Sequence, residues 1–534
     1  MAPEQKEEAR SEGARLHITP RDSATMASSR ETLNENKPYS SEDSSIMANN
    51  DKEIEEKLEK PQDDNSEGGQ DRFLVQWDGP NDPGCPKGIK KRNKWIITLI
   101  IAGGAFNTTC ASSIYTSTYT QIQKEFNSSH ELAIAGLSLF VMGLGIGPMF
   151  LAPLSEFYGR RPIYIVSFAC YILFLIPCAA AQNITTLLVG RFLDGVAGSA
   201  FLSVAGGTVG DMFEKADLGL PMMVYTASPF IGPEIGPLIG GFINENTSWR
   251  WTWYVMIIWS FVEWTLLCMV PETYNPVLLQ RKAARIRQET GDDRYYAPND
   301  KRQYGILRTV LLSCQRPFLL LVFEPMVLAL CTFTALLLGI LYMFFQAFAI
   351  VFEGAHGFTL SQLGLSFMGL FIGMLLGVMT DPIWRRTYAR LVAKRGGESI
   401  PEFRLTPGIM GGILVPIGLF WFGFTTYPSV HWIVPIIGSV FFGMGTLLVY
   451  SAVFAFLVDC YPLYAASAMA ANSFTRSCFA AGFPLFSTQM YNTLGNQYAT
   501  LILALLTVVL APFPFLFFKY GEKLRRKSRY AKSP

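Results

Sequence analysis

A charged pair stands inside an otherwise apolar stretch of this sequence. Arg191 and Asp194 lie three residues apart within residues 185–211, a run long enough to cross a bilayer as a helix. On a helix they share a face, and an arginine at membrane depth almost always faces a partner or a cavity. Such a pair can couple a proton to a conformational change, because desolvation favours the protonated acid while the arginine favours the ionised one. A static salt bridge that fixes helix packing is the alternative.

Further polar side chains lie inside apolar stretches. Glu234 and Glu263 are acids at the expected membrane depth, and Arg476 is a second base there. The sequence around Gln346 is rich in aromatic residues, which could line an apolar cavity with Gln346 as the polar contact. Packing against lipid or against the protein core is the alternative for such an aromatic stripe. We expect the substrate cavity to include Tyr342, Phe345, Gln346, Glu263 and Arg476.

Motifs of enzymes are missing from the sequence. There is no phosphate loop of the Gly-x-x-x-x-Gly-Lys type, so the chain has no means of its own to hydrolyse ATP. The 4 histidines fall outside the apolar stretches, and the 9 cysteines are scattered without paired spacing. We therefore expect no metal, no cofactor and no enzymatic activity. If the apolar stretches form a transporter, its energy should come from an ion gradient.

The composition indicates which elements position these residues. Half of the residues are apolar and only 16% are charged, whereas a soluble domain carries roughly 25% charged residues. Backbone groups in lipid must be hydrogen-bonded internally, so long apolar runs cross the bilayer as helices. The sequence predicts an all-α integral membrane protein with twelve transmembrane helices, at 95–116, 132–154, 162–181, 185–211, 220–242, 251–270, 324–350, 360–382, 407–425, 433–457, 464–487 and 496–519.

Charge and length divide the chain into five parts. Residues 1–82 carry 20 acidic and 10 basic side chains, so they cannot bury enough apolar surface to fold. A long polar connection then separates six spans from six. We expect 1–94 to be a disordered acidic cytoplasmic tail with a basic end, 95–270 the N-terminal bundle, 271–323 a cytoplasmic connecting loop, 324–519 the C-terminal bundle and 520–534 a basic cytoplasmic tail.

Lysine and arginine concentrate in alternate connections between the spans. They cluster before the first span, after the second, sixth and eighth spans, and after the last one. The intervening connections are nearly free of them, which places both termini in the cytoplasm. Three glycosylation sequons then fall on the outer side, and they begin at Asn127, Asn183 and Asn246.

Two stretches of ten residues match each other across the halves of the chain. Residues 152–161 follow the second span and 377–386 follow the eighth, with an acid and two arginines at the same spacing. The match supports two equivalent halves with a binding site at their interface. Gly159 permits a tight turn, and Glu156 could meet the positive N-terminal end of the eleventh helix. We expect a conformational latch, with a simple topology anchor as the alternative, at Glu156, Gly159, Arg160, Arg161, Asp381 and Arg385.

The fifth span repeats glycine and proline. Its glycines recur every four residues along one face, which lets a neighbouring helix backbone approach closely. Each proline removes a backbone donor and bends the helix. Such a stripe suits a rocking contact between two bundles, and an ordinary packing face is the alternative. The stripe consists of Gly232, Pro233, Gly236, Pro237, Gly240 and Gly241.

Several of these stretches resemble signature motifs of the major facilitator superfamily. Residues 154–162 resemble the motif of its loop between helices 2 and 3. Residues 190–195 resemble its helix 4 motif, which implies proton coupling at Arg191. Residues 232–241 resemble the antiporter motif of helix 5, which is typical of exporters. Within the superfamily the chain is similar to the fungal twelve-span drug:proton antiporters of the multidrug and polyamine exporter group, also at 77–83, 248–253, 271–276, 461–467 and 483–486.

Two departures narrow the substrate that this resemblance implies. The run 271–274 reads Pro-Glu-Thr-Tyr, whereas sugar porters usually carry Pro-Glu-Ser-Pro-Arg there. Similar sequences often have glutamate in place of Gln346, and a cationic polyamine would gain from that carboxylate. The resemblance therefore implies a proton-coupled exporter of uncharged, apolar organic compounds such as drugs, toxins or a secondary metabolite. A polyamine exporter, a proton symporter for uptake and a non-transporting sensor are the alternatives.

The expected partners are a small-molecule substrate, protons and the lipid bilayer. We expect a monomer with no nucleic-acid partner. The resemblance and the charge pattern indicate a multi-pass protein of the plasma membrane, with the vacuolar membrane as the alternative because both keep lysine and arginine on the cytosolic side.

Overall fold

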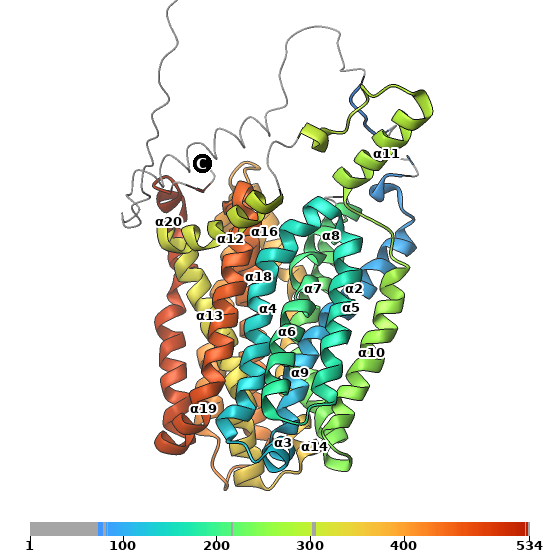
Figure 1. Ribbon diagram of the computed structural model, residues 1–534. Helices are drawn as coiled ribbons and strands as arrows, with labels where there is room; N and C mark the ends of the chain where they lie inside the picture. Colours follow the sequence, from blue (N-terminus) through green and yellow to red (C-terminus); the bar gives the residue numbers. More distant parts are fainter. Residues whose placement is uncertain are drawn as a thin grey trace, which may run out of the picture. The chain divides into compact units, whose positions relative to one another are not determined.

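The computed structural model describes residues 73–77, 82, 84–214, 217–301, 306–528 and 530–531. Helices dominate these residues, and their β-structure is confined to an isolated bridge between Leu74 and Tyr296. The long helices run side by side along one direction (Figure 1). We call the end with α11, α16 and α20 the basic end, after Arg281, Arg386 and Arg526, and the end with α3 and α14 the sequon end, after Asn127, Asn183 and Asn246.

The first half begins at the basic end with α2, which continues through a 3-10 turn into α3. Two of its helices start with side-chain caps, since the Ser129 hydroxyl accepts from the Leu132 N–H and the Asn183 carbonyl oxygen accepts from the Thr186 N–H. The helices of this half are α2 (Lys91–Ile114), α3 (Tyr119–Phe126), α4 (His130–Tyr158), α5 (Arg160–Ala179), α6 (Ile184–Gly198), α7 (Ala200–Ser203), α8 (Ala205–Met212), α9 (Gly219–Asn246) and α10 (Arg250–Cys268).

The connection between the halves and the second half are also helical. The connection holds α11 (Asn275–Thr290) and α12 (Ile306–Phe323). A π-helical turn, η4 (Ala349–Ala355), extends the first long helix of the second half. The helices that follow are α13 (Pro325–Phe348), α14 (Leu360–Ser366), α15 (Met368–Met379), α16 (Asp381–Lys394), α17 (Thr406–Phe424), α18 (Ile433–Cys460), α19 (Ala465–Leu510) and α20 (Pro512–Arg525).

The described residues confirm the prediction of an all-α membrane protein. Ten helical segments are long and apolar enough to cross a bilayer. Helix α9 is not among them, because its prolines and glycines lower its hydropathy, yet it runs unbroken for 28 residues between its neighbours. The last segment contains two spans, since α19 passes through a non-helical Gly495 with φ 80°. The described helices therefore supply the twelve spans.

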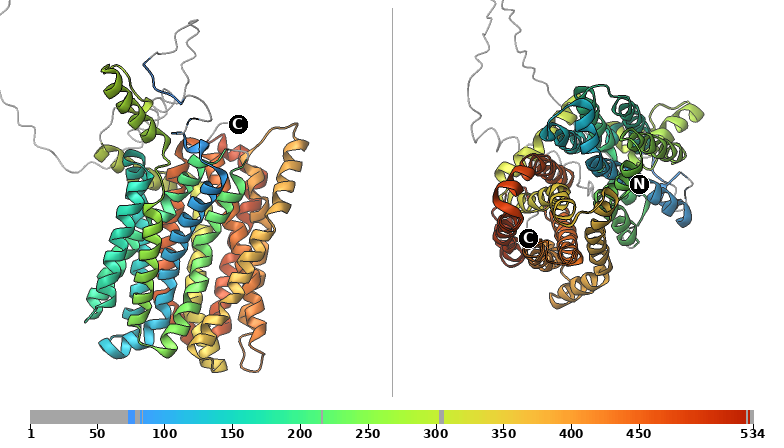
Figure 2. Two further views of the ribbon diagram at one scale, coloured as in Figure 1. Left: turned by 90° about the vertical axis from the view of Figure 1, so that its right-hand side faces the viewer. Right: turned by 90° about the horizontal axis from the view of Figure 1, so that it is seen from below.

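The two halves repeat one packing device. In the first half, Gly143 of α4 and Gly195 of α6 each face the backbone of the other helix. In the second half, Gly373 of α15 and Gly443 of α18 do the same. A Cβ atom added at Gly143 would lie 2.5 Å from the Phe192 carbonyl oxygen, so only glycine permits these backbones to touch. Seen along the bundle, the halves form two neighbouring groups of helices (Figure 2).

Ordered contacts reach into segments predicted as tails or as a loop. Residues 1–72 lie outside the described part of the chain, but the Val75 N–H donates to the Tyr296 carbonyl at 3.0 Å, so this piece of the expected 1–94 tail docks on the connection. Beyond residue 519, the guanidinium of Arg525 is buried against the Glu402 carboxylate at 2.7 Å. Both tails therefore have structured portions next to the bundle.

Candidate functional site

Arg191 is fully buried in α6, where four other elements surround it. Its guanidinium donates to the carbonyl oxygens of Ala111 and Ser112 in α2, at 3.1 and 3.3 Å, and to that of Gly136 in α4 at 3.4 Å. Three aromatic rings lie around it, and the closest centroid is 4.0 Å away. These rings belong to Tyr115, Phe140 and Trp253. A charge buried at this depth needs such contacts to offset desolvation.

The predicted pairing of Arg191 with Asp194 is present but loose. Nη1 of Arg191 lies 3.8 Å from Oδ2 of Asp194, and both side chains are fully buried. Neither carboxylate oxygen of Asp194 has a hydrogen-bond partner among the described residues. A buried carboxylate without donors is stable chiefly when it carries a proton. The geometry therefore provides a protonatable group beside a fixed positive charge.

Glu234 of α9 is a second buried acid without partners, and it lies where the halves meet. Its side chain is fully buried, and neither of its oxygens has a hydrogen bond among the residues described. It stands within electrostatic reach of Tyr342 in α13 and Tyr450 in α18. The hydroxyl of Tyr342 is also 2.8 Å from that of Ser112 in α2. Residues of both halves thus lie near this carboxyl group.

Of the five predicted cavity residues, the structure brings Tyr342 and Arg476 into this region. The guanidinium of Arg476 stands over the rings of Phe230, Tyr450 and Phe454. We call Ser112, Glu234, Tyr342, Tyr450 and Arg476 the central cluster.

The other three predicted cavity residues lie apart from the central cluster or at its edge. Glu263 of α10 faces Gly103 of α2 within the first half, and its place in a shared cavity stays a prediction. Phe345 packs against the ring of Tyr342. Gln346 interacts with Tyr119 nearer the sequon end, and its amide nitrogen has no hydrogen bond within the described chain. Hydropathy cannot distinguish residues of the central cluster from the others, because all five lie within apolar stretches of the sequence.

The turn after α4 is held by an acid that sequence reasoning did not single out. Glu272, just beyond α10, accepts from the backbone N–H groups of Arg160 and Arg161, at 2.9 and 3.2 Å. It thus caps the N-terminus of α5. The Arg160 guanidinium reaches Asp211 of α8 at 3.4 Å. These contacts join α4, α5, α8 and α10 at the basic end.

The expected contact of Glu156 with a helix N-terminus is missing among the described residues, and its role in a latch stays a prediction. Glu156 has neither a hydrogen bond nor an ion pair among the described residues, and Glu272 instead occupies a helix N-terminus, that of α5. In the second half, Asp381 pairs with Arg385 at 2.5 Å within α16. Arg385 lies next to Gly219 at the start of α9, so this arginine contacts the other half. The sequence feature that could have pointed to Glu272 is the run Pro-Glu-Thr-Tyr at 271–274, which contains it.

Gly159→Ala is expected to destabilise the turn. Gly159 has φ 98°, which side-chain-bearing residues rarely adopt, and an added Cβ would lie 2.8 Å from the Glu272 carboxyl carbon. Strain of roughly 1–3 kcal/mol should lower the melting temperature of the purified protein and its level at the cell surface. Gly210→Ala in α8, where the added atom meets open space, is the control. Equal melting temperatures for the two variants would contradict the role of this glycine.

The glycine stripe of α9 mainly packs within its own half. A Cβ at Gly232, Gly236 or Gly240 would overlap the backbone of α2, at 2.9 Å from the Cys110 nitrogen in the first case. The stripe meets the second half at Gly241, where an added Cβ would lie 2.6 Å from the Leu360 carbonyl oxygen, and at the Pro237 carbonyl, which lies against Gly364 of α14. The stripe thus makes contact between the halves at its last residues, and the rocking contact itself stays a prediction. Pro233 and Pro237 lie inside the unbroken helix.

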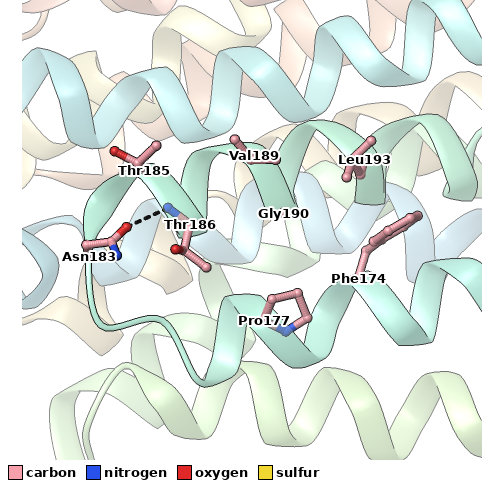
Figure 3. Close-up of a pocket in the computed structure, with 8 residues that line it drawn as sticks. All are labelled: Phe174, Pro177, Asn183, Thr185, Thr186, Val189, Gly190 and Leu193. Atoms are coloured by element: carbon pink, nitrogen blue, oxygen red, sulfur yellow. Dashed lines mark hydrogen bonds between the residues drawn. The ribbon is translucent and has the colours of Figure 1, made fainter.

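The predicted sequons are exposed at the sequon end. Asn127 ends α3, Asn246 ends α9, and Asn183 precedes α6. A hollow of about 630 Å³ lies beside Asn183 on the flank between α5 and α6 (Figure 3). None of the predicted cavity residues lines it; its walls are Phe174, Pro177, Asn183, Thr185, Thr186, Val189, Gly190 and Leu193.

Comparisons with known proteins agree with this architecture. The family model described as Major Facilitator Superfamily matches residues 101–483. The chain is 52% identical over 466 residues to "Efflux pump atB" of Aspergillus terreus, with 86% of this chain and 90% of that protein covered. It is 41% identical over 496 residues to "Probable drug/proton antiporter YHK8" of Saccharomyces cerevisiae, with coverages of 92% and 96%.

A solved structure shows the same fold at low sequence identity. The partially occluded inward-open xylose transporter XylE from E. coli matches with a TM-score of 0.56 and 16% identity, over 80% of this chain and 99% of its own. The family model spans most of the chain, and the fungal relatives match nearly its whole length. The chain therefore belongs to the major facilitator superfamily, in its group of fungal efflux pumps and drug:proton antiporters, and is a transporter and not an enzyme.

Proposed function

We propose that this transporter exports small organic compounds with an apolar body in exchange for protons. The observation that carries the proposal is Glu234, a fully buried carboxyl group without a hydrogen-bond partner where residues of the two halves meet. The fungal relatives named as efflux pumps and as a drug/proton antiporter support export as the direction. One relative is named for a drug as its substrate, and we propose drugs, toxins or a secondary metabolite as the substrates of this chain.

In the proposed cycle Glu234 and Asp194 carry the proton. A neutral carboxyl group can stay buried without donors, whereas an ionised one requires water or a cation. Protonation therefore favours the closely packed arrangement around Glu234, and loss of the proton favours separation of the halves there. Arg191 remains charged throughout and biases Asp194 toward releasing its proton. Alternating access then follows from movement of one half against the other.

Contacts between the halves at the sequon end support a gate there. The Glu245 carboxylate at the end of α9 accepts from the Ser361 N–H of α14 at 2.8 Å. Gly241 and Gly364 bring the same helices into backbone contact. We propose that these contacts close the outer side when the substrate enters from the basic end. The turns with Arg160 and Arg385 would act as latches at the basic end.

The orientation of the protein, its membrane and its oligomeric state belong to the same proposal. We infer that the basic end faces the cytosol, so that both termini are cytoplasmic and the sequons at Asn127, Asn183 and Asn246 face outward, where they can be glycosylated. We further propose the plasma membrane as the location and a monomer as the working unit, with residues 95–270 and 324–519 as the moving bundles.

The direct test is transport by the purified protein in liposomes with an imposed pH gradient. An antiporter accumulates substrate in the compartment from which protons leave, and a protonophore abolishes the accumulation. Candidate substrates come from a resistance screen in pump-deficient yeast across drugs, polyamines and weak acids. Accumulation in the opposite direction would establish symport. Absence of flux for every compound that binds would favour a sensor.

Gln346→Glu is expected to raise the transport of polyamines relative to neutral drugs. The amide nitrogen of Gln346 has no partner among the described residues, and a carboxylate there would attract a polyamine cation. We expect a rise of about tenfold in the ratio of spermidine to neutral-drug flux, equivalent to roughly 1.4 kcal/mol. The isosteric change Gln346→Met is the uncharged control. An unchanged ratio would remove Gln346 from the specificity site.

A further inference from the structure

Arg476 lies between the two halves and has no counter-ion among the described residues. It lies on α19, eleven residues into the helix from Ala465, and makes no hydrogen bond or ion pair with any described residue. Its Nε atom is buried, yet the side chain as a whole is only half-buried. An arginine at membrane depth is costly unless an anion, carbonyl oxygens or water receive its charge.

Aromatic rings from both halves surround this guanidinium. The rings of Phe454 and Tyr450 on α18 lie 5.0 and 5.5 Å from it, and that of Phe230 on α9 lies at 5.6 Å. Phe230 and Tyr450 are stacked, with centroids 4.6 Å apart and an interplanar angle of 20°. The faces of such rings attract the cation, and the one hydroxyl among them, that of Tyr450, donates to the Thr334 carbonyl at 3.3 Å.

The contrast with Arg191 shows what Arg476 lacks. Arg191 is also surrounded by rings, but three carbonyl oxygens and Asp194 complete its surroundings. Arg476 makes no such hydrogen bond or ion pair within the described part of the chain, so its five N–H donors can bind another molecule. The acid of the central cluster, Glu234, has no hydrogen bond to it or to any other described residue. A guanidinium with free donors beside flat apolar surfaces fits a carboxylate attached to a planar body.

We propose that Arg476 binds the carboxylate of an exported organic acid, whose planar apolar body lies against Phe230, Tyr450 and Phe454. The inference rests on the proposed export function and narrows its substrate class to organic monoanions. Because Phe230 belongs to the first half and Arg476 to the second, the bound anion contacts both bundles.

The test is equilibrium binding to the full-length protein in lipid nanodiscs without a pH gradient. Radiolabelled benzoate is the anionic probe, and benzamide is the neutral probe of the same shape. We expect the wild type to bind benzoate more tightly than benzamide. Arg476→Gln should weaken benzoate binding at least tenfold and change benzamide binding less than threefold. Arg476→Lys should give an intermediate loss, because lysine keeps the charge but not the planar donors.

Control variants separate the site from general effects. Arg526→Gln removes an exposed arginine of the second half and should bind both probes as the wild type does. Phe230→Ala should weaken both probes to a similar extent, because it removes a ring and no charge. If Arg476→Gln fails to fold, judged by size-exclusion chromatography, Arg476→Lys replaces it in the test. A weaker preference for benzoate over benzamide than in the wild type supports the site, and an unchanged preference contradicts it.

Two results would overturn the inference. One is benzoate binding that is equal in the wild type and Arg476→Gln. The other is a wild type that prefers benzamide or binds neither probe at millimolar concentration. Proton-driven flux of a neutral drug alongside either result would leave the export function intact. Arg476-dependent benzoate binding without any proton-driven flux would contradict the export function and keep the anion site.

Discussion

Arg191→Ala is expected to abolish proton-driven efflux while the protein still reaches the membrane. The change removes three hydrogen bonds to α2 and α4 and the charge beside Asp194. Asp194 would then hold its proton with no cation to favour release. We expect flux to fall at least a hundredfold, measured as substrate accumulation in liposomes under a pH gradient. Surface expression is measured in parallel with a fluorescent fusion.

The control is Arg250→Ala. Arg250 starts α10, pairs with Glu125 at 2.6 Å and is partly exposed at the sequon end. A partly exposed pair contributes little, roughly 0–1 kcal/mol, so this variant should transport normally. Normal efflux by well-expressed Arg191→Ala would reduce Arg191 to a packing residue. Loss of surface expression would be addressed with Asp194→Asn, which keeps the arginine contacts and should also uncouple transport.

Glu234→Gln is expected to uncouple substrate movement from the pH gradient. The amide has the shape of the protonated acid but cannot release a proton. Accumulation against a concentration gradient should fall at least tenfold, whereas exchange of labelled for unlabelled substrate should continue. Both rates are measured in the same liposomes with and without a pH gradient.

Glu263→Gln provides a matched comparison. Glu263 is also buried at membrane depth in the first half, but it faces Gly103 and lies apart from the central cluster. We expect this variant to keep proton-driven accumulation. Equal accumulation by Glu234→Gln and the wild type would show that Glu234 does not carry the coupled proton.

The fold was predictable because its causes are local in sequence. Apolar runs of about 20 residues and alternating basic connections specify spans and their direction without any contact information. The features of the helices that differ from regular spans also arise from local sequence. Gly495 turns the chain within what is otherwise continuous helix, and α9 is a span whose prolines lower its hydropathy. Hydropathy places both within a few residues but says nothing of their geometry.

The site was only partly predictable because its contacts join distant segments. The pair of Arg191 and Asp194 was visible, since three residues on a helix set their proximity. The capping of α5 by Glu272 was not, because more than a hundred residues separate the partners. The same holds for Arg476, whose neighbour Phe230 lies in the other half. Sequence also could not distinguish Glu234 from Glu263, although one faces the interface and the other does not.

The glycine contacts between α4 and α6, and between α15 and α18, make each half a stiff lever. Backbones that touch leave no side chains to rearrange, so a half should turn as one body. Helix α9, with 28 residues, is roughly 42 Å long. A turn of roughly 10° about its middle would displace each end by roughly 4 Å, which is enough to separate Gly241 from Leu360. A small torque applied by substrate and proton near Glu234 would thus be amplified at both ends of the molecule.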